Sequence, residues 1–186
     1  WYVALASISA FLITGILGFM LTPDGWPWNK NFFAAFFNPS FIPQLFIRLS
    51  FSIVIGAFLA SGYLSLSKFN REFRSSAIKT FGTIGLVALV TWGLSSWWYF
   101  AVVPSTFKTH AVYFFLTKFL SQQPQLLWLA ALPAALIVLI FAGVSSAGRV
   151  GAAKILFIPA LILAIGFVVQ FERVREFIRG PFLMPG

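Results

Sequence analysis

The fold is decided by residues 43–67, which read PQLFIRLSFSIVIGAFLASGYLSLS. This run carries a single charge, on Arg48 near its beginning. A helix needs about 20 mainly apolar residues to cross the hydrocarbon core of a bilayer. The stretch is long enough and apolar enough, so we predict that residues 43–67 form a membrane-spanning helix.

Four further stretches satisfy the same criterion, and the composition agrees with them. The 186-residue chain is 60% hydrophobic and 9% charged, whereas a soluble domain has about 25% charged residues. Its mean hydropathy is +0.92. We therefore expect an all-α integral membrane protein, a single domain over residues 1–186 built as a bundle of about five transmembrane helices. The predicted helices cover residues 1–21, 43–67, 78–103, 126–145 and 150–171.

The two long connections are predicted to lie in the membrane interface. The first, around residues 22–39, is rich in Trp and Phe. Trp is enriched where lipid headgroups meet the hydrocarbon, and Trp and Phe both form the apolar face of segments that lie in the interface. The second, residues 105–121, has polar residues at helical spacing on one side and phenylalanines on the other. This pattern predicts an amphipathic interfacial helix.

The net charge of +9 comes mainly from short turns between apolar runs, around residues 68–79 and 149–154. Anionic lipid headgroups or a partner subunit are therefore better counterions than nucleic acid, which we do not expect as a partner. Positive residues are concentrated in cytoplasmic loops. We expect the two short basic turns in the cytoplasm, with the long loops and the C-terminus outside.

The absence of some residue types and the scarcity of others exclude several kinds of metal and cofactor site. The chain has no cysteine, so thiolate metal sites, iron–sulfur clusters and covalent haem attachment are ruled out within these residues. Axial ligation of haem b needs His or Met, and the chain has one His and two Met. No catalytic triad, phosphate-binding loop or paired membrane carboxylate is present. We expect no metal site and no enzymatic activity from the chain alone.

A resemblance to subunit I of the cytochrome bd quinol oxidases covers residues 1 to about 100. Residues 18–26, GFMLTPDGW, are similar to the turn that ends the family's fourth helix. Residues 38–86, beginning NPSFIPQLFIRLSFSIVIG, resemble its fifth and sixth helices, with Asn38-Pro39 opening the fifth and Gly56 and Gly62 matching family glycines. The resemblance implies a multi-pass protein of a bacterial or archaeal inner membrane.

One departure from the family bears on cofactors. The fifth helix of the family carries a histidine that ligates a low-spin haem b, and in this chain that position is Ile47. The adjacent Arg48 is either a lipid or loop-carbonyl contact or an interface contact to a propionate or carboxylate of a partner subunit. We therefore expect no cofactor held by this chain alone. The resemblance is compatible with a quinone or a partner subunit's haem bound at an interface between subunits.

Two further residues are candidates for catalysis. His110 follows the predicted third helix, roughly where the family oxidises quinol, so it is a candidate proton acceptor; it is otherwise a polar residue of the interfacial helix. Glu172 lies in a weak match to a family motif whose Glu ligates a high-spin haem. It otherwise belongs to a charged helical stem that ends at Gly180-Pro181.

These observations favour one function and leave two alternatives. The first hypothesis is a haem-poor relative of cytochrome bd subunit I that anchors and scaffolds a respiratory electron-transfer complex. Its partners would be other membrane and periplasmic electron-transfer subunits that carry haem. The alternatives are a catalytic quinol-oxidising subunit whose other haem ligands lie outside this chain, and a membrane assembly factor.

Overall fold

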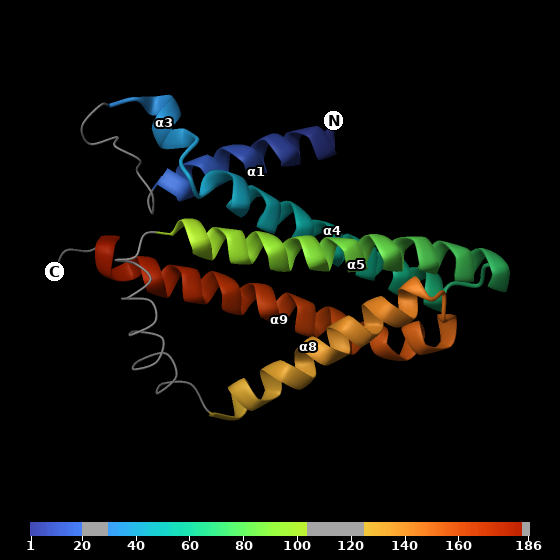
Figure 1. The fold of residues 1–186 in the computed structure, drawn as a ribbon. Helices are drawn as coiled ribbons and strands as arrows, with labels where there is room; N and C mark the ends of the chain where they lie inside the picture. The colour runs from blue at the N-terminus through green and yellow to red at the C-terminus, as the bar shows by residue number, and fades with distance from the viewer. Residues whose placement is uncertain (20–29, 104–124, 184–186) are drawn as a thin grey trace. The chain divides into compact units, whose positions relative to one another are not determined.

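The computed structural model describes residues 1–19, 30–103 and 125–183 (Figure 1). Within these ranges all regular secondary structure is α-helical. The helices are α1 (Tyr2–Phe19), α3 (Phe32–Phe36), α4 (Phe41–Leu66), α5 (Arg71–Val102), α8 (Gln125–Ser146) and α9 (Val150–Leu183). The predicted all-α fold is confirmed, whereas the predicted interfacial helix over residues 105–121 lies outside the described residues.

Helix α5 begins at Arg71, well before the predicted start at residue 78. Asn70 explains the earlier start, because its side-chain Oδ1 accepts a hydrogen bond from the backbone N–H of Glu72 at 3.1 Å. Asn is among the best residues for capping a helix N-terminus. The charged residues after Asn70 are therefore the first turns of the helix and not a loop.

Helix α9 also extends further than expected, to Leu183. The apolar part, Val150–Val169, agrees with the predicted span over residues 150–171. The predicted end at Gly180-Pro181 is wrong, because the helix includes both residues. Between them and the span lie mostly Glu, Arg and apolar residues, and Glu and Arg are strong helix formers.

Three of the described helices are long and apolar enough to cross a membrane. They are Phe41–Leu66, Arg71–Val102 and the Val150–Val169 part of α9. The other two predicted spans correspond to α1 and α8, in which the described apolar stretches Ala4–Gly18 and Ala134–Ser146 are shorter. The chain is a multi-pass membrane protein of the kind that the hydropathy predicts.

The chain forms two compact units. In its described part, unit 1 contains residues 1–19, 30–51 and 90–103, and unit 2 contains residues 52–89 and 125–183. The prediction of one transmembrane domain over residues 1–186 stays a prediction.

Unit 1 is organised around α1, α3 and the first turns of α4. Asn31 caps the short helix α3, since its Oδ1 accepts hydrogen bonds from the N–H groups of Phe33 and Ala34 at 3.0 and 3.3 Å. A side chain at Gly15 of α1 would collide with the Phe36 ring. Glycine at this position therefore lets α3 lie directly against α1.

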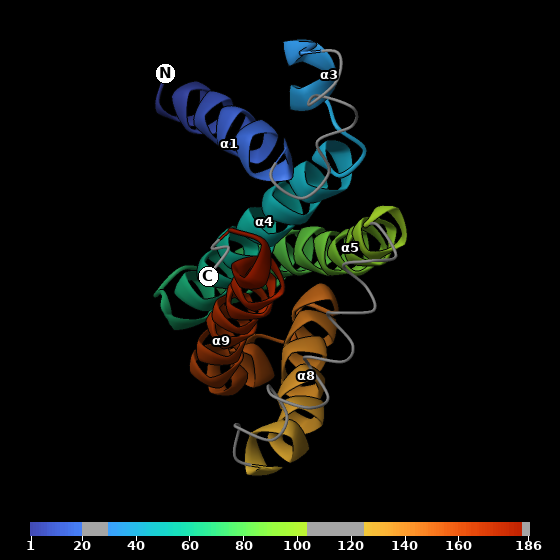
Figure 2. The same ribbon diagram turned by 90° about the vertical axis from the view of Figure 1, so that its left-hand side faces the viewer.

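Unit 2 has an apolar core to which α4, α5, α8 and α9 all contribute. Helices α8 and α9 are joined by a short turn and are packed on one another (Figure 2). At the centre the rings of Phe58 and Phe141, each at most 1% exposed, meet edge to face with centroids 4.7 Å apart. Small side chains complete the core on α9, where Ala153, Ala160 and Ala164 are buried.

Candidate functional site

The position of the expected haem ligand lies on α4 in unit 1. Ile47 is buried there, with 5% of its side chain exposed, and Arg48 beside it is half-buried. Gln44 lies one turn earlier on the same helix and is also 5% exposed. The site therefore combines an aliphatic side chain with a polar and a cationic one.

A chain of buried hydrogen bonds leads from Gln44 to the end of α1. The Nε2 of Gln44 donates to Ser40 Oγ at 3.2 Å, and that hydroxyl lies 2.7 Å from Asn38 Oδ1 and 3.4 Å from the Gly18 carbonyl. Asn38 Nδ2 in turn donates to the carbonyls of Ala35 and Phe36 at 3.0 and 3.3 Å. These bonds fix the beginning of α4 against α1 and α3.

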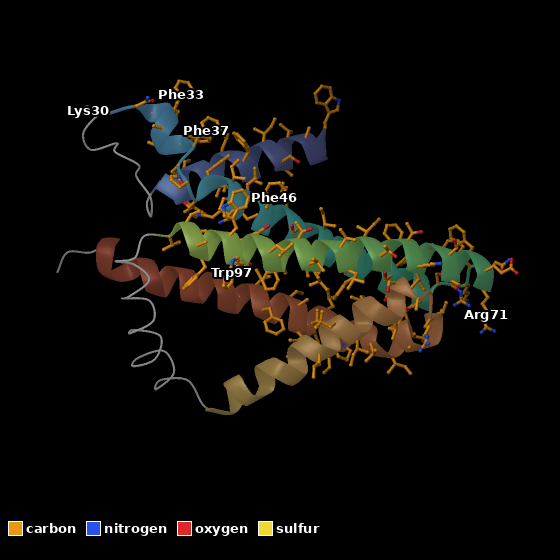
Figure 3. The ribbon with its side chains drawn as sticks, in the orientation of Figure 1. Lys30, Phe33, Phe37, Phe46, Arg71 and Trp97 are labelled. Atoms are coloured by element: carbon orange, nitrogen blue, oxygen red, sulfur yellow. The ribbon has the colours of Figure 1, made fainter. Side chains whose placement is uncertain are left out.

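Four phenylalanines pack beside this polar chain. The ring of Phe41, which is 1% exposed, lies 5.0 Å from that of Phe11, 5.5 Å from Phe36 and 5.3 Å from Phe37, measured between centroids. Figure 3 shows Phe33 and Phe37 on and just after α3. Asn38, Ser40 and Gln44 are buried beside these rings, and a buried hydrogen bond is electrostatically stronger than one in water.

The residues at this position do not fit an axially ligated haem. Ile47 has no atom that can coordinate iron, and a guanidinium such as that of Arg48 is not a haem ligand. Within the described part of the chain, no group of three or more His, Cys, Asp and Glu side chains could hold a metal ion.

The side chains of the other two predicted site residues lie outside the part of the chain that the structure describes. His110 lies outside the described residues. Glu172 is part of helix α9 in unit 2. The structure describes its backbone but not its side chain. Their proposed roles stay predictions.

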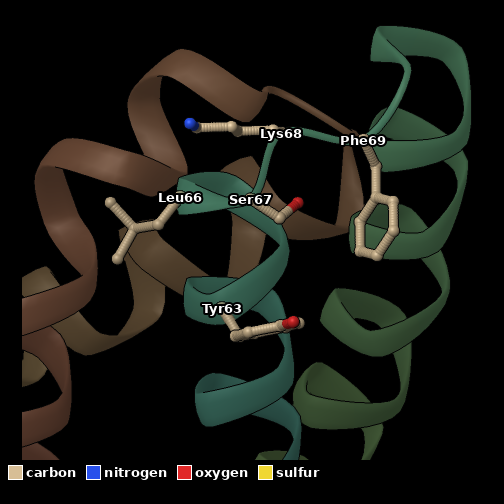
Figure 4. A pocket seen from close by; sticks show the side chains of 5 residues that line it. All are labelled: Tyr63, Leu66, Ser67, Lys68 and Phe69. Carbon is tan, nitrogen blue, oxygen red and sulfur yellow. The ribbon is translucent and has the colours of Figure 1, made fainter.

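Unit 2 contains a second notable feature, an open pocket of about 380 Å³ where α4 ends. It is lined by Tyr63, Leu66, Ser67, Lys68 and Phe69 (Figure 4). Sequence reasoning identified the basic turn but not this pocket. The sequence signal for this pocket was the grouping of Tyr63, Leu66 and Phe69 with Lys68 within seven residues. This grouping places apolar and cationic side chains around the end of one helix.

The polar chain at Gln44 was also missed by sequence reasoning. Asn38-Pro39 was identified as a helix start, which is correct to within two residues, since α4 begins at Phe41. Nothing in the sequence shows that the side chain of Asn38 contacts Gly18, because the two residues are far apart along the chain. That contact becomes visible only when α1 and α4 are placed together.

A sequence profile of the cytochrome bd terminal oxidase subunit I family matches residues 1–104, more than half of the chain. The match covers α1, α3, α4 and α5 and confirms the resemblance that was expected over residues 1 to about 100. No curated protein and no solved structure matches the chain. The chain therefore belongs to the cytochrome bd terminal oxidase subunit I family.

Proposed function

We propose that this chain is a haem-poor member of its family that anchors and scaffolds a multi-subunit respiratory electron-transfer complex in the inner membrane. The observation that carries the proposal is Ile47, a buried aliphatic residue at the position where the resemblance has a haem-ligating histidine. Loss of that ligand removes the simplest way for this chain to bind a low-spin haem.

A scaffolding role is supported by the large apolar surface that the helices present. On α1, Leu5, Ile8 and Ile16 are each more than half exposed. On α5, Val87, Leu94 and Trp97 are exposed by 61, 67 and 77%. Such surfaces are suited to lipid or to the helices of other subunits, because both cover apolar side chains without requiring new hydrogen bonds.

In this proposal the redox cofactors belong to partner subunits that carry haem, some of them periplasmic. Arg48 is the residue of this chain that would contact a propionate or carboxylate of such a partner, and a quinone would lie at the shared interface. The two short basic turns would face the cytoplasm, since Lys and Arg concentrate in cytoplasmic loops.

The proposal is tested by a reduced-minus-oxidised absorbance spectrum, with subunit mass spectrometry, on the complex that co-purifies with the chain in mild detergent. We expect a b-type haem signal from the complex and none from the chain purified alone. Haem retained by the isolated chain would overturn the proposal. A chain that is substoichiometric in the complex would instead indicate an assembly factor.

Two variants separate scaffolding from the catalytic alternative. In the proposal, His110→Ala and Glu172→Ala leave quinol-dependent electron transfer in the assembled complex within about twofold of the wild type. A general acid or base contributes about 100-fold or more to a rate. A loss of that size in either variant, with assembly and haem content intact, would make the chain a catalytic subunit.

A further inference from the structure

Six cations gather at two helix connections of unit 2, on the turns themselves and on the N-terminal parts of α5 and α9 that follow them. Among the residues whose side chains are described, one carboxylate, Glu72, accompanies them. All of the cations except the half-buried Arg74 are exposed. The group, which we call the basic platform, consists of Lys68, Arg71, Arg74, Lys79, Arg149 and Lys154. Figure 3 shows Arg71 where α5 begins.

The platform is held together by tertiary contacts between its two turns. Ser75 Oγ on α5 donates a hydrogen bond to the carbonyl of Gly148, the residue before Arg149, at 3.0 Å. Gly148 has φ +67°, and a Cβ there would lie 2.8 Å from Ser75 Oγ and 3.6 Å from the Cβ of Lys79. Gly148 thus permits a close approach between the turn that precedes Arg149 and the part of α5 that carries Lys79.

The pocket at the end of α4 adjoins this platform. Arg74 Nη1 donates to the Ser67 carbonyl at 3.2 Å, so a platform residue fixes the pocket wall. Arg74 Nε is buried without a hydrogen-bond partner among the described residues. Figure 4 shows the Lys68 side chain extending over the end of α4 on the side of Leu66, with Tyr63, Ser67 and Phe69 directed to the other side.

The pocket walls are apolar as well as cationic. Tyr63, Leu66 and Phe69 are exposed by 66, 56 and 50%. The Phe69 ring packs against that of Phe73 with centroids 5.6 Å apart, and Phe73 is itself 56% exposed. Exposed rings beside exposed ammonium and guanidinium groups are suited to a ligand with an anionic head and an apolar body.

We propose that this pocket and the basic platform bind an anionic phospholipid. The headgroup phosphate lies at the end of α4 among Lys68, Arg71 and Arg149. One acyl chain lies against Leu66 and the other against Tyr63 and Phe69, on the opposite side of that end (Figure 4). Juxtamembrane cations attract anionic lipids, and tyrosine rings such as that of Tyr63 are favoured at headgroup depth. A phospholipid satisfies both features, whereas a soluble anion would leave the aromatic rings uncovered. The inference requires a membrane-embedded chain but not the haem-poor scaffold.

The test is native mass spectrometry of the detergent-purified complex titrated separately with phosphatidylglycerol and phosphatidylcholine. We expect preferential binding of phosphatidylglycerol. A surface cation contributes roughly a fivefold affinity for anionic lipid. Lys68→Gln and Arg149→Gln should each weaken phosphatidylglycerol binding about fivefold, and the double variant about 25-fold, with phosphatidylcholine binding unchanged.

Lys30→Gln is the matched control, since it removes an exposed cation from unit 1. It should leave phosphatidylglycerol binding unchanged, and far-UV circular dichroism should show equal helix content in all variants. Equal binding of the two lipids by the wild type, or an equal loss in Lys30→Gln, would overturn the proposal. Displacement of phosphatidylglycerol by equimolar inorganic phosphate would also overturn it, because the ligand would then be a free anion.

Discussion

Gly18 in unit 1 and Gly82 in unit 2 both lie against a neighbouring segment. The neighbour of Gly18 is a side chain, whereas the neighbour of Gly82 is the backbone of another helix. A Cβ on Gly18 would lie 2.8 Å from Asn38 Nδ2, the end of a side chain. A Cβ on Gly82 would collide with the backbone of Ser145 and Ser146, where α8 ends. A side chain can rotate away, but the backbone of a packed helix cannot. Unit 2 is therefore fixed by close helix approach, and unit 1 by a polar chain under aromatic rings.

The same difference appears in what is buried. The core of unit 2 is formed by Phe, Ile, Val, Leu and Ala side chains from four helices. In unit 1, Asn38, Ser40 and Gln44 are buried together and hydrogen-bonded to one another. Lipid is as apolar as a core of Leu and Phe, so helices in a membrane associate through close packing and hydrogen bonds. Buried hydrogen bonds are more prominent in unit 1, although it also has the close approach at Gly15, and apolar packing is more prominent in unit 2, although it also has the bond from Ser75 to Gly148.

The largest effect is expected from Gly82→Ala. The new methyl would displace the end of α8, and overpacking of this kind costs up to about 3 kcal/mol of unfolding free energy. Thermal unfolding and denaturant titration in mild detergent measure the loss. Gly93→Ala on the same helix is the control, because nothing lies within 4 Å of its Cβ position, and it should change stability by less than about 1 kcal/mol. Equal effects would contradict the close approach of α5 and α8.

Asn38→Ala should have an intermediate effect, about 2 kcal/mol, because it leaves buried backbone and hydroxyl groups of unit 1 without partners. The same unfolding measurements apply. Asn31→Ala is the matched control: it removes an exposed cap from a five-residue helix, and such a cap contributes about 1 kcal/mol. If Asn31→Ala is as damaging as Asn38→Ala, the buried hydrogen bonds do not hold unit 1 together.

The smallest effect is expected from Gln44→Met. Gln44 Oε1 has no hydrogen-bond partner within the described part of the chain, and its Nε2 makes one bond, of 3.2 Å, to Ser40. Replacing a half-satisfied buried amide by an apolar group of similar size should change stability by no more than about 0.5 kcal/mol. A loss as large as that of Asn38→Ala would show that Gln44 Oε1 accepts a bond in the assembled complex.

Hydropathy located the membrane helices, because a span must be about 20 apolar residues long whatever it packs against. Boundaries were less accurate where polar residues continue a helix, as after Asn70 on α5 and beyond residue 171 on α9. At the site, the order of motifs predicts that Ile47 stands at the family's haem-ligand position, and the structure shows that Ile47 is buried. The roles of Arg48, His110 and Glu172 stay predictions.

The sequence by itself determined that the chain is an all-α membrane protein and that it belongs to the cytochrome bd subunit I family. Both follow from local composition and from the order of residues along the chain. Only the tertiary structure decided which glycines meet side chains and which meet backbone, and that the Ser75 and Gly148 contact joins two basic turns into one platform. Such contacts join residues far apart in sequence, and their energies depend on distances that no local pattern encodes.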